Sequence, residues 1–205
     1  MLNHSLLANI KTTLQKSKVE KLAAIASGDS FSVADLIDVS FYHHEQIGFR
    51  AAWILENVYT NHELRFLPHA LYFLEKLPQQ HNLSALRHYV KILALMTKRN
   101  ASIDIKKIIE HYDTDYLVEV VFAWLIDEKI PVAVKSHCLN ILANLTAKHS
   151  WIKEELLQTM DFLVDKESIG FFAKVKQIRR QLSVRGCRFL ITNDKWTNDQ
   201  SATDQ

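Results

Sequence analysis

The stretch IGFRAAWILENV, from Ile47 to Val58, decides how this chain folds. It combines small residues, one arginine and paired apolar positions. Three later stretches repeat that pattern: LSALRHYVKILALM from Leu83, PVAVKSHCLNILANL from Pro131 and SIGFFAKVKQIRRQL from Ser168. A pattern that returns along a chain indicates that one structural unit is built several times.

The apolar positions of the first stretch predict how such units pack. Ile47, Ala51 and Ile54 fall on one side of a helix. Phe49 and Trp53 fall on nearly the opposite side, which is therefore apolar as well. A helix that is apolar on two sides cannot bury both against one partner, so we expect it to lie between its own partner and the neighbouring pair. The four stretches are predicted to be the inner helices of a solenoid.

Composition supports an all-α fold. The chain has 205 residues but only 4 glycines and 3 prolines, where average usage would give roughly 14 and 10. Folds with many tight turns or phosphate-binding loops need more glycine. The length fits a single domain with a sizeable core. The formal net charge is only +2, so bulk charge predicts neither a nucleic-acid nor a membrane partner.

Helix boundaries are marked by capping residues and prolines. Ser32 followed by Asp35 predicts a capping box, and Pro78 is expected to end the helix before it. Ser84, Thr114 and Ser150 are predicted N-caps. We expect helices near 5–26 (broken near Ser17), 32–42, 46–60, 68–77, 84–97, 103–111, 114–127, 131–147, 151–164 and 169–183.

Most of these helices group into pairs. We expect one domain over 1–185, with an N-terminal helical cap over 1–30 and a C-terminal tail over 186–205. The predicted repeats are 32–60, 68–97, 114–147 and 151–183, with an extra helix over 103–111. The second helix of each pair has a basic residue near its start, and these residues are Arg50, Arg87, Lys135 and Lys174.

The quoted stretches resemble the second helices of HEAT/armadillo-type repeats. FRAAWILENV and PVAVKSHCLNILANL carry this resemblance. In that family, valine or alanine precedes a basic residue, as Val134 precedes Lys135, and alanine and leucine follow at helical spacing. The resemblance covers about 32–183, and the whole chain is also similar to small bacterial HEAT-like proteins. It implies a right-handed α-α superhelix of about four hairpins, whose inner helices line a concave surface. Arg50, Arg87, Lys135 and Trp53 would then be structural residues of the repeats.

The resemblance also implies ion pairs within repeats, because an acidic residue in the turn often pairs with the basic residue of the second helix. Glu45 would serve Arg50, and Asp127 or Glu128 would serve Lys135.

Candidate chemistry is sparse. The histidine-rich turns at His43–Glu45 and Asn61–Glu63 hold two His-Glu pairs, whereas the iron-binding HEAT-repeat hydroxylases use four, placed in both halves of the chain. We therefore expect surface histidines, no metal and no cofactor. No glycine-rich phosphate loop and no nucleophile motif occurs, so no catalytic residue is assigned. A carboxylate pair from Asp113 and Asp115, or from Glu154 and Glu155, stays open, although acids at helix starts usually serve the helix dipole.

The sharpest local feature is a basic stretch. Between Ser168 and Asn193 there is no aspartate or glutamate. The basic residues of this stretch are Lys174, Lys176, Arg179, Arg180, Arg185 and Arg188. They are predicted either to bind phosphates or an acidic partner, or to form the polar outer surface of a capping repeat.

These observations favour a non-catalytic interaction or scaffold module that binds another protein. The alternative is binding of a nucleic-acid backbone by the C-terminal basic helix, as in HEAT-like DNA-repair proteins. We expect no membrane partner, because the most apolar window, Tyr116–Ile126, is short and contains Glu119. The absence of a signal-peptide pattern, and two cysteines without paired spacing, predict a cytoplasmic location. Trp196 is expected in a polar tail.

Overall fold

The computed structural model describes residues 4–11, 14–26 and 31–193, with side chains up to residue 183, and shows helices and no strand within these ranges. The helices are α1 (His4–Ile10), α2 (Lys16–Ile25), α3 (Val33–Val39), α4 (Glu45–Asn61), α5 (Glu63–Phe66), α6 (Ala70–Lys76), α7 (Leu83–Met96), α8 (Ile103–His111), α9 (Asp115–Ile126), α10 (Val132–Leu145), α11 (Ile152–Val164) and α12 (Ile169–Asn193). Two 3₁₀ turns, Leu67–His69 and Leu77–Gln79, flank α6. The predicted all-α class is confirmed.

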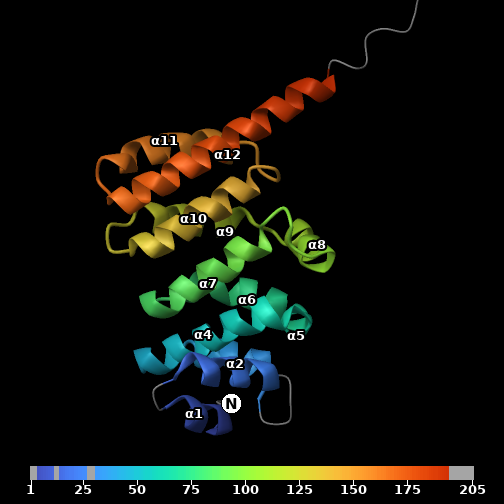
Figure 1. The fold of residues 1–205 in the computed structure, drawn as a ribbon, viewed down its shortest axis with the longest axis vertical. Helices are drawn as coiled ribbons and strands as arrows, with labels where there is room; N and C mark the ends of the chain where they lie inside the picture. Colours follow the sequence, from blue (N-terminus) through green and yellow to red (C-terminus); the bar gives the residue numbers. More distant parts are fainter. Residues whose placement is uncertain (1–3, 12–13, 27–30, 194–205) are drawn as a thin grey trace, which may run out of the picture.

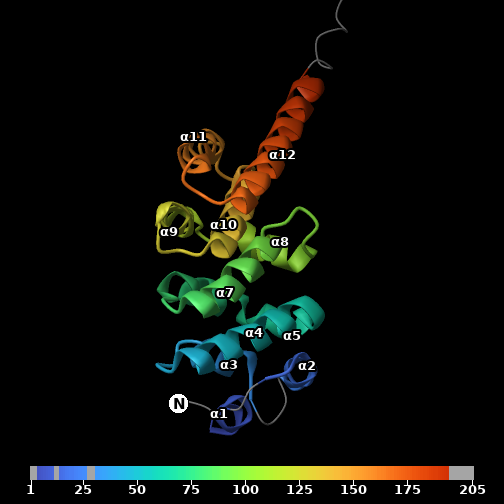
Figure 2. The same ribbon diagram turned by 60° about the vertical axis from the view of Figure 1, so that its left-hand side comes forward.

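The helices are stacked in one column, with α1 and α2 at one end and α12 at the other (Figure 1). The second helices α4, α7, α10 and α12 follow one another, and each packs directly on the next. The first helices α3 and α9 pack on α4 and α10, and α11 packs on both α10 and α12. The extra helix α8 contacts α6 and α7, and Figure 2 shows it on the opposite side of the column from α9 and α11. This is the helical-hairpin solenoid expected from the sequence.

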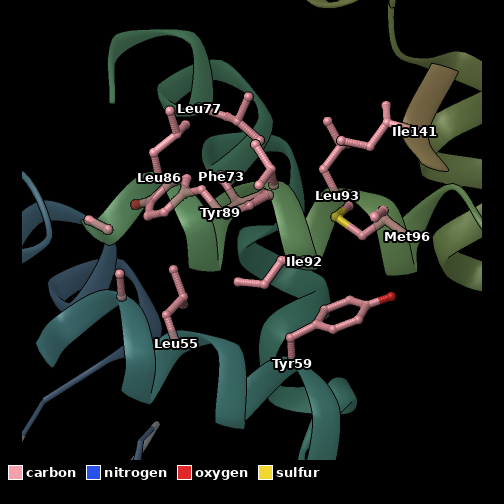
Figure 3. Close-up of a cluster of buried hydrophobic side chains, with 14 of the residues drawn as sticks. Leu55, Tyr59, Phe73, Leu77, Leu86, Tyr89, Ile92, Leu93, Met96 and Ile141 are labelled. Atoms are coloured by element: carbon pink, nitrogen blue, oxygen red, sulfur yellow. The ribbon is translucent and has the colours of Figure 1, made fainter. Parts of the chain in front are cut away.

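The packing of α7 shows why the hairpins depend on one another (Figure 3). The Tyr89 ring stacks on Phe73 of α6, with 4.9 Å between centroids. Ile92 points towards Leu55 of α4, whereas Met96 lies towards α10. All these side chains are buried. Since α7 shares its apolar surface with three other helices, its hairpin has no core of its own.

The prediction that Phe49 and Trp53 are buried on the second apolar side of α4 is confirmed only in part. The buried residues of α4 form one broad arc from Ile47 to Tyr59, and this arc already reaches α2, α3 and α7. Phe49 and Trp53 are only half-buried, with ring centroids 6.1 Å apart. Trp53 packs against the edge of the core, and Phe49 meets the neighbouring pair through the ring of His88 at 5.3 Å.

Several helix boundaries differ from the expected ones. The break between α1 and α2 ends just before Lys16, close to the predicted break near Ser17. A short helix, α5, precedes Pro68, which lies in a 3₁₀ turn where its missing N–H costs no helical hydrogen bond. Helix α12 continues to Asn193, past the predicted end at residue 183 and into the predicted tail. Residues 194–205, with Trp196, lie outside the described part of the chain.

Candidate functional site

Acidic residues are distributed unequally between first and second helices. Helices α7, α10 and α12 contain no aspartate or glutamate, whereas α3, α9 and α11 together carry seven. The second helices α4, α7, α10 and α12 each leave one side exposed or half-exposed. We call the surface that these sides form together the inner-helix face. Its residues are Phe49, Trp53, Glu56, Arg87, His88, Lys91, Lys98, His137, Asn140, Asn144, Lys174, Gln177 and Gln181. Because these helices form one row, their side chains make a continuous surface.

Glu56 is the one acidic member of this face, and it is neutralised. Its carboxylate accepts a hydrogen bond from His88 Nδ1 at 2.6 Å and forms an ion pair with Lys91. Burial raises the pKa of Glu56, but the hydrogen bonds from His88 and Lys91 outweigh it and hold the pKa below its usual value. The Glu56 carboxylate therefore adds little net negative charge to the face.

Amide side chains connect the next three helices. Asn144 on α10 donates from Nδ2 to Thr97 Oγ1 at 3.4 Å, at the end of α7. Its Oδ1 accepts a hydrogen bond from Gln181 on α12 at 3.2 Å. The side chains of α7, α10 and α12 are thus directly joined along the face.

His137, on α10, lies between cations of the two neighbouring second helices. Burial lowers the pKa of His137 to about 4, and the positive charges of Lys91, Lys174 and Arg87 lower it further, whereas Glu56 acts in the opposite direction. The pKa of Lys174 is lowered as well, by burial and by the charge of Lys98. Helices α7 and α12, on either side of α10, therefore contribute to one positive region.

The structure divides the basic residues predicted on α12. Lys174 belongs to the inner-helix face, where it donates to Gln177. Arg179 turns to the other flank and forms an ion pair with Asp161 of α11. Lys176 lies 5.7 Å from the centre of the Phe172 ring, and Arg180 is exposed. Arg185 and Arg188 lie in the last part of α12, where side chains are not described.

The basic residues predicted as structural have unequal surroundings. Arg50 donates to the backbone carbonyls of Ile10 and Lys11, at 2.9 and 2.7 Å, and so caps the C-terminus of α1. Arg87 is exposed on the inner-helix face. An Arg50–Glu45 pair is not seen among the described residues.

The predicted pairing of Lys135 with Asp127 or Glu128 is also wrong. Its side chain is 1 % exposed and pairs with Glu167, in the turn before α12, rather than with Asp127 or Glu128. The reason is its place on α10, since it lies on the buried arc that faces α12 and not on the side of its own turn.

One arrangement resembles a catalytic triad but is closed to a substrate. His149 Nε2 lies 2.6 Å from Thr114 Oγ1, and His149 Nδ1 lies 3.2 Å from Asp115 Oδ1. Thr114 is only 1 % exposed, so its hydroxyl cannot reach a reacting atom. The group instead joins the turn before α9 to the turn before α11.

Sequence reasoning missed most of the inner-helix face. It noted the lack of acids only in 168–193, although 76–103 and 129–153 also contain none. These two segments hold α7 and α10, and with them Lys91 and His137.

The described residues form neither a metal-binding cluster nor a membrane-spanning helix. Within the described ranges, no three His, Cys, Asp or Glu side chains come together as metal ligands would. No helix in the part of the chain that the structure describes has both the length and the hydropathy needed to cross a bilayer.

Comparison with known proteins agrees with the stacked architecture. The family model for the HEAT repeat domain matches residues 6–182, which is most of the chain. A search among curated proteins finds no match. The match begins within α1 and ends within α12, so it covers α4, α7 and α10 in full and the first half of α12. The chain belongs to the HEAT repeat domain family.

Proposed function

We propose that this protein is a non-catalytic interaction module that binds a partner protein on its inner-helix face. HEAT repeats generally mediate protein interactions. The observation that carries the proposal is the separation of charge, since α7, α10 and α12 have no acidic residue while the first helices have many. Packing of the core does not require such a separation, because most of these charged residues are exposed.

The proposal includes a cytoplasmic location. Cys138 is a free, buried thiol, which suits a reducing compartment.

Site-specific photo-crosslinking tests the choice of face. A photo-reactive amino acid is placed at Gln177, exposed on α12, and in a control protein at Glu155, exposed on α11. In extract of the cells that make the protein, Gln177 is expected to crosslink one defined partner that Glu155 does not. Identical adducts from both positions, or none from Gln177, would contradict the proposal.

Nucleic-acid binding by α12 is the second candidate, supported by the absence of acids along the whole helix. Titration of DNA and RNA at increasing salt tests it. The double change Arg179→Glu and Arg180→Glu should abolish such binding, and lack of binding at low salt removes this candidate. The ion pair between Arg179 and Asp161 weighs against it, because one of the cations is already neutralised.

A further inference from the structure

The partner chemistry can be read from the inner-helix face, an inference that rests on the proposed function. Its exposed or half-exposed cations come from three places: Arg87 and Lys91 on α7, Lys98 just beyond it, and Lys174 on α12. No described residue of α7, α10 or α12 is acidic, and the Glu56 carboxylate is held by His88 and Lys91. Glu56 offsets only one of these four cations, so the face carries a net positive charge.

The α4 end of the same face is apolar. Phe49 and Trp53 lie side by side there, half-buried, and the Phe49 ring also meets His88. His88 in turn holds Glu56, which pairs with Lys91. The aromatic pair and the nearest cation of α7 are thus linked through two side chains, close enough for one ligand to contact both.

The arrangement of the helices favours an extended ligand. Packed helices have axes about 8–10 Å apart, and an extended chain advances about 3.3 Å per residue. A segment that crosses from α4 to α12 therefore needs roughly eight to ten residues. Spacing the cations along a row of helices suits a chain with several carboxylates better than a compact anion.

Nucleic acid fits this face less well. Tight backbone binders neutralise about 6–10 phosphates, whereas the described part of the face offers the four cations named above, interrupted by amide side chains.

We propose that the inner-helix face binds an extended acidic polypeptide segment of the partner, with one apolar side chain seated on Phe49 and Trp53 and carboxylates over Arg87, Lys91, Lys98 and Lys174.

Fluorescence anisotropy with the full chain tests this proposal. The probe is a fluorescein-labelled peptide of twelve residues, built from glutamate and serine with one leucine. The comparison probes are the same peptide with glutamine for glutamate, the same peptide with serine for leucine, and a labelled oligothymidylate of twelve nucleotides. The acidic leucine peptide is expected to bind tightest, with an affinity that falls as salt is raised.

Matched charge reversals locate the binding. Lys91→Glu with Lys174→Glu is expected to weaken binding of the acidic peptide at least about tenfold. Lys107→Glu with Lys153→Glu, exposed changes on α8 and α11 with the same change in net charge, should leave it within about twofold. Because Lys91 holds Glu56, the single change Arg87→Glu, at an exposed position, provides a second test that spares this pair.

Three results would overturn the inference: equal binding of the glutamine peptide, equal loss with the control pair, or tighter binding of the oligothymidylate that the Lys91 and Lys174 changes abolish. If Gln177 still crosslinks a partner protein while the acidic peptide fails to bind, the inference fails and the proposed function stands. If both fail, the proposed function fails as well.

Discussion

Gly48 is a residue whose identity is set by close packing. A Cβ at this position would lie 2.7 Å from the backbone carbonyl oxygen of Ser40, which cannot move as a side-chain tip can. Gly48→Ala should therefore lower the free energy of unfolding by about 1–3 kcal/mol, despite the helix propensity of alanine, which favours it by about 1 kcal/mol. Urea denaturation measures the difference.

Gly170 provides the matched control. A Cβ there would meet only Ser168 Oγ, at 3.8 Å, an ordinary contact. Gly170→Ala should leave stability unchanged or raise it by up to about 1 kcal/mol. Equal destabilisation by both changes would show that the contact with Ser40 is not what requires glycine at 48.

The pair of Lys135 and Glu167 is the most deeply buried ion pair among the described residues. Glu167→Leu leaves the ammonium of Lys135 buried without its partner and should cost about 3 kcal/mol of stability. Lys135→Met should cost less, because Glu167 is nearer to solvent, with 14 % of its side chain exposed. The double change should recover part of the loss, since it removes both charges.

Chemical denaturation of the three variants measures this cycle. Strictly additive losses would mean that the two side chains do not depend on each other.

At the scale of elements, α8 is held to the column by Lys148. This side chain, after α10, donates to the carbonyl oxygens of Ile109, Glu110 and Tyr112 at 3.0, 3.0 and 2.6 Å. These carbonyls end α8 and have no helical partner, so a cation there stabilises the helix. Lys148→Met should destabilise the protein by about 1–2 kcal/mol and speed hydrogen exchange in α8.

Lys107→Met is the control, because Lys107 is an exposed residue of the same helix with only an Asp104 pair at 3.8 Å. If it increases exchange in α8 as much as Lys148→Met does, the capping role of Lys148 is wrong.

The contact of α7, α10 and α12 should respond to pH through His137. Its pKa is about 4 in the folded protein, against an ordinary value of 6.5, so the unfolded chain binds the proton first as pH falls. The titration of His137 therefore lowers the free energy of unfolding as pH falls from about 6.5 towards 4. The groups that set its charge environment are Lys91, Lys174, Arg87 and Glu56. The lowered pKa of Glu56 adds a loss only below its ordinary value of 4.5.

Urea midpoints at pH 7.5 and 5.0 measure this effect. His137→Gln should make the urea midpoint fall less between pH 7.5 and pH 5.0. An unchanged decrease in the variant would assign it to other groups.

At the scale of the whole molecule, the sequence predicted local patterns better than partners. The capping box of Ser32 and Asp35 is confirmed, because both groups lie within one turn of helix. The prediction of Ser84 as the N-cap of α7 is wrong, since the side chain of Asn82 accepts the hydrogen bonds from the first turn of this helix. Two polar residues so close together compete for one role, and only the path of the incoming chain decides between them.

Longer-range partners were beyond sequence reasoning. Lys135 pairs with Glu167, 32 residues away, because α10 and α12 are neighbours in the stack. A repeat period predicts that helices are neighbours, but it does not predict which flank of each helix faces the other. For the same reason Arg179 and Lys174, close in sequence, lie on different flanks of α12.

The central structural claim is that neighbouring hairpins share their core and thereby bring the second helices into one row. Ile141 on α10 is fully buried and lies beside Leu93 and Met96 of α7 (Figure 3). Hydrogen exchange of the variant Ile141→Ala, expected to lose about 2–5 kcal/mol of stability, tests the claim most directly. We predict faster exchange in α7 as well as in α9 and α10. Acceleration confined to α9 and α10 would contradict the shared core.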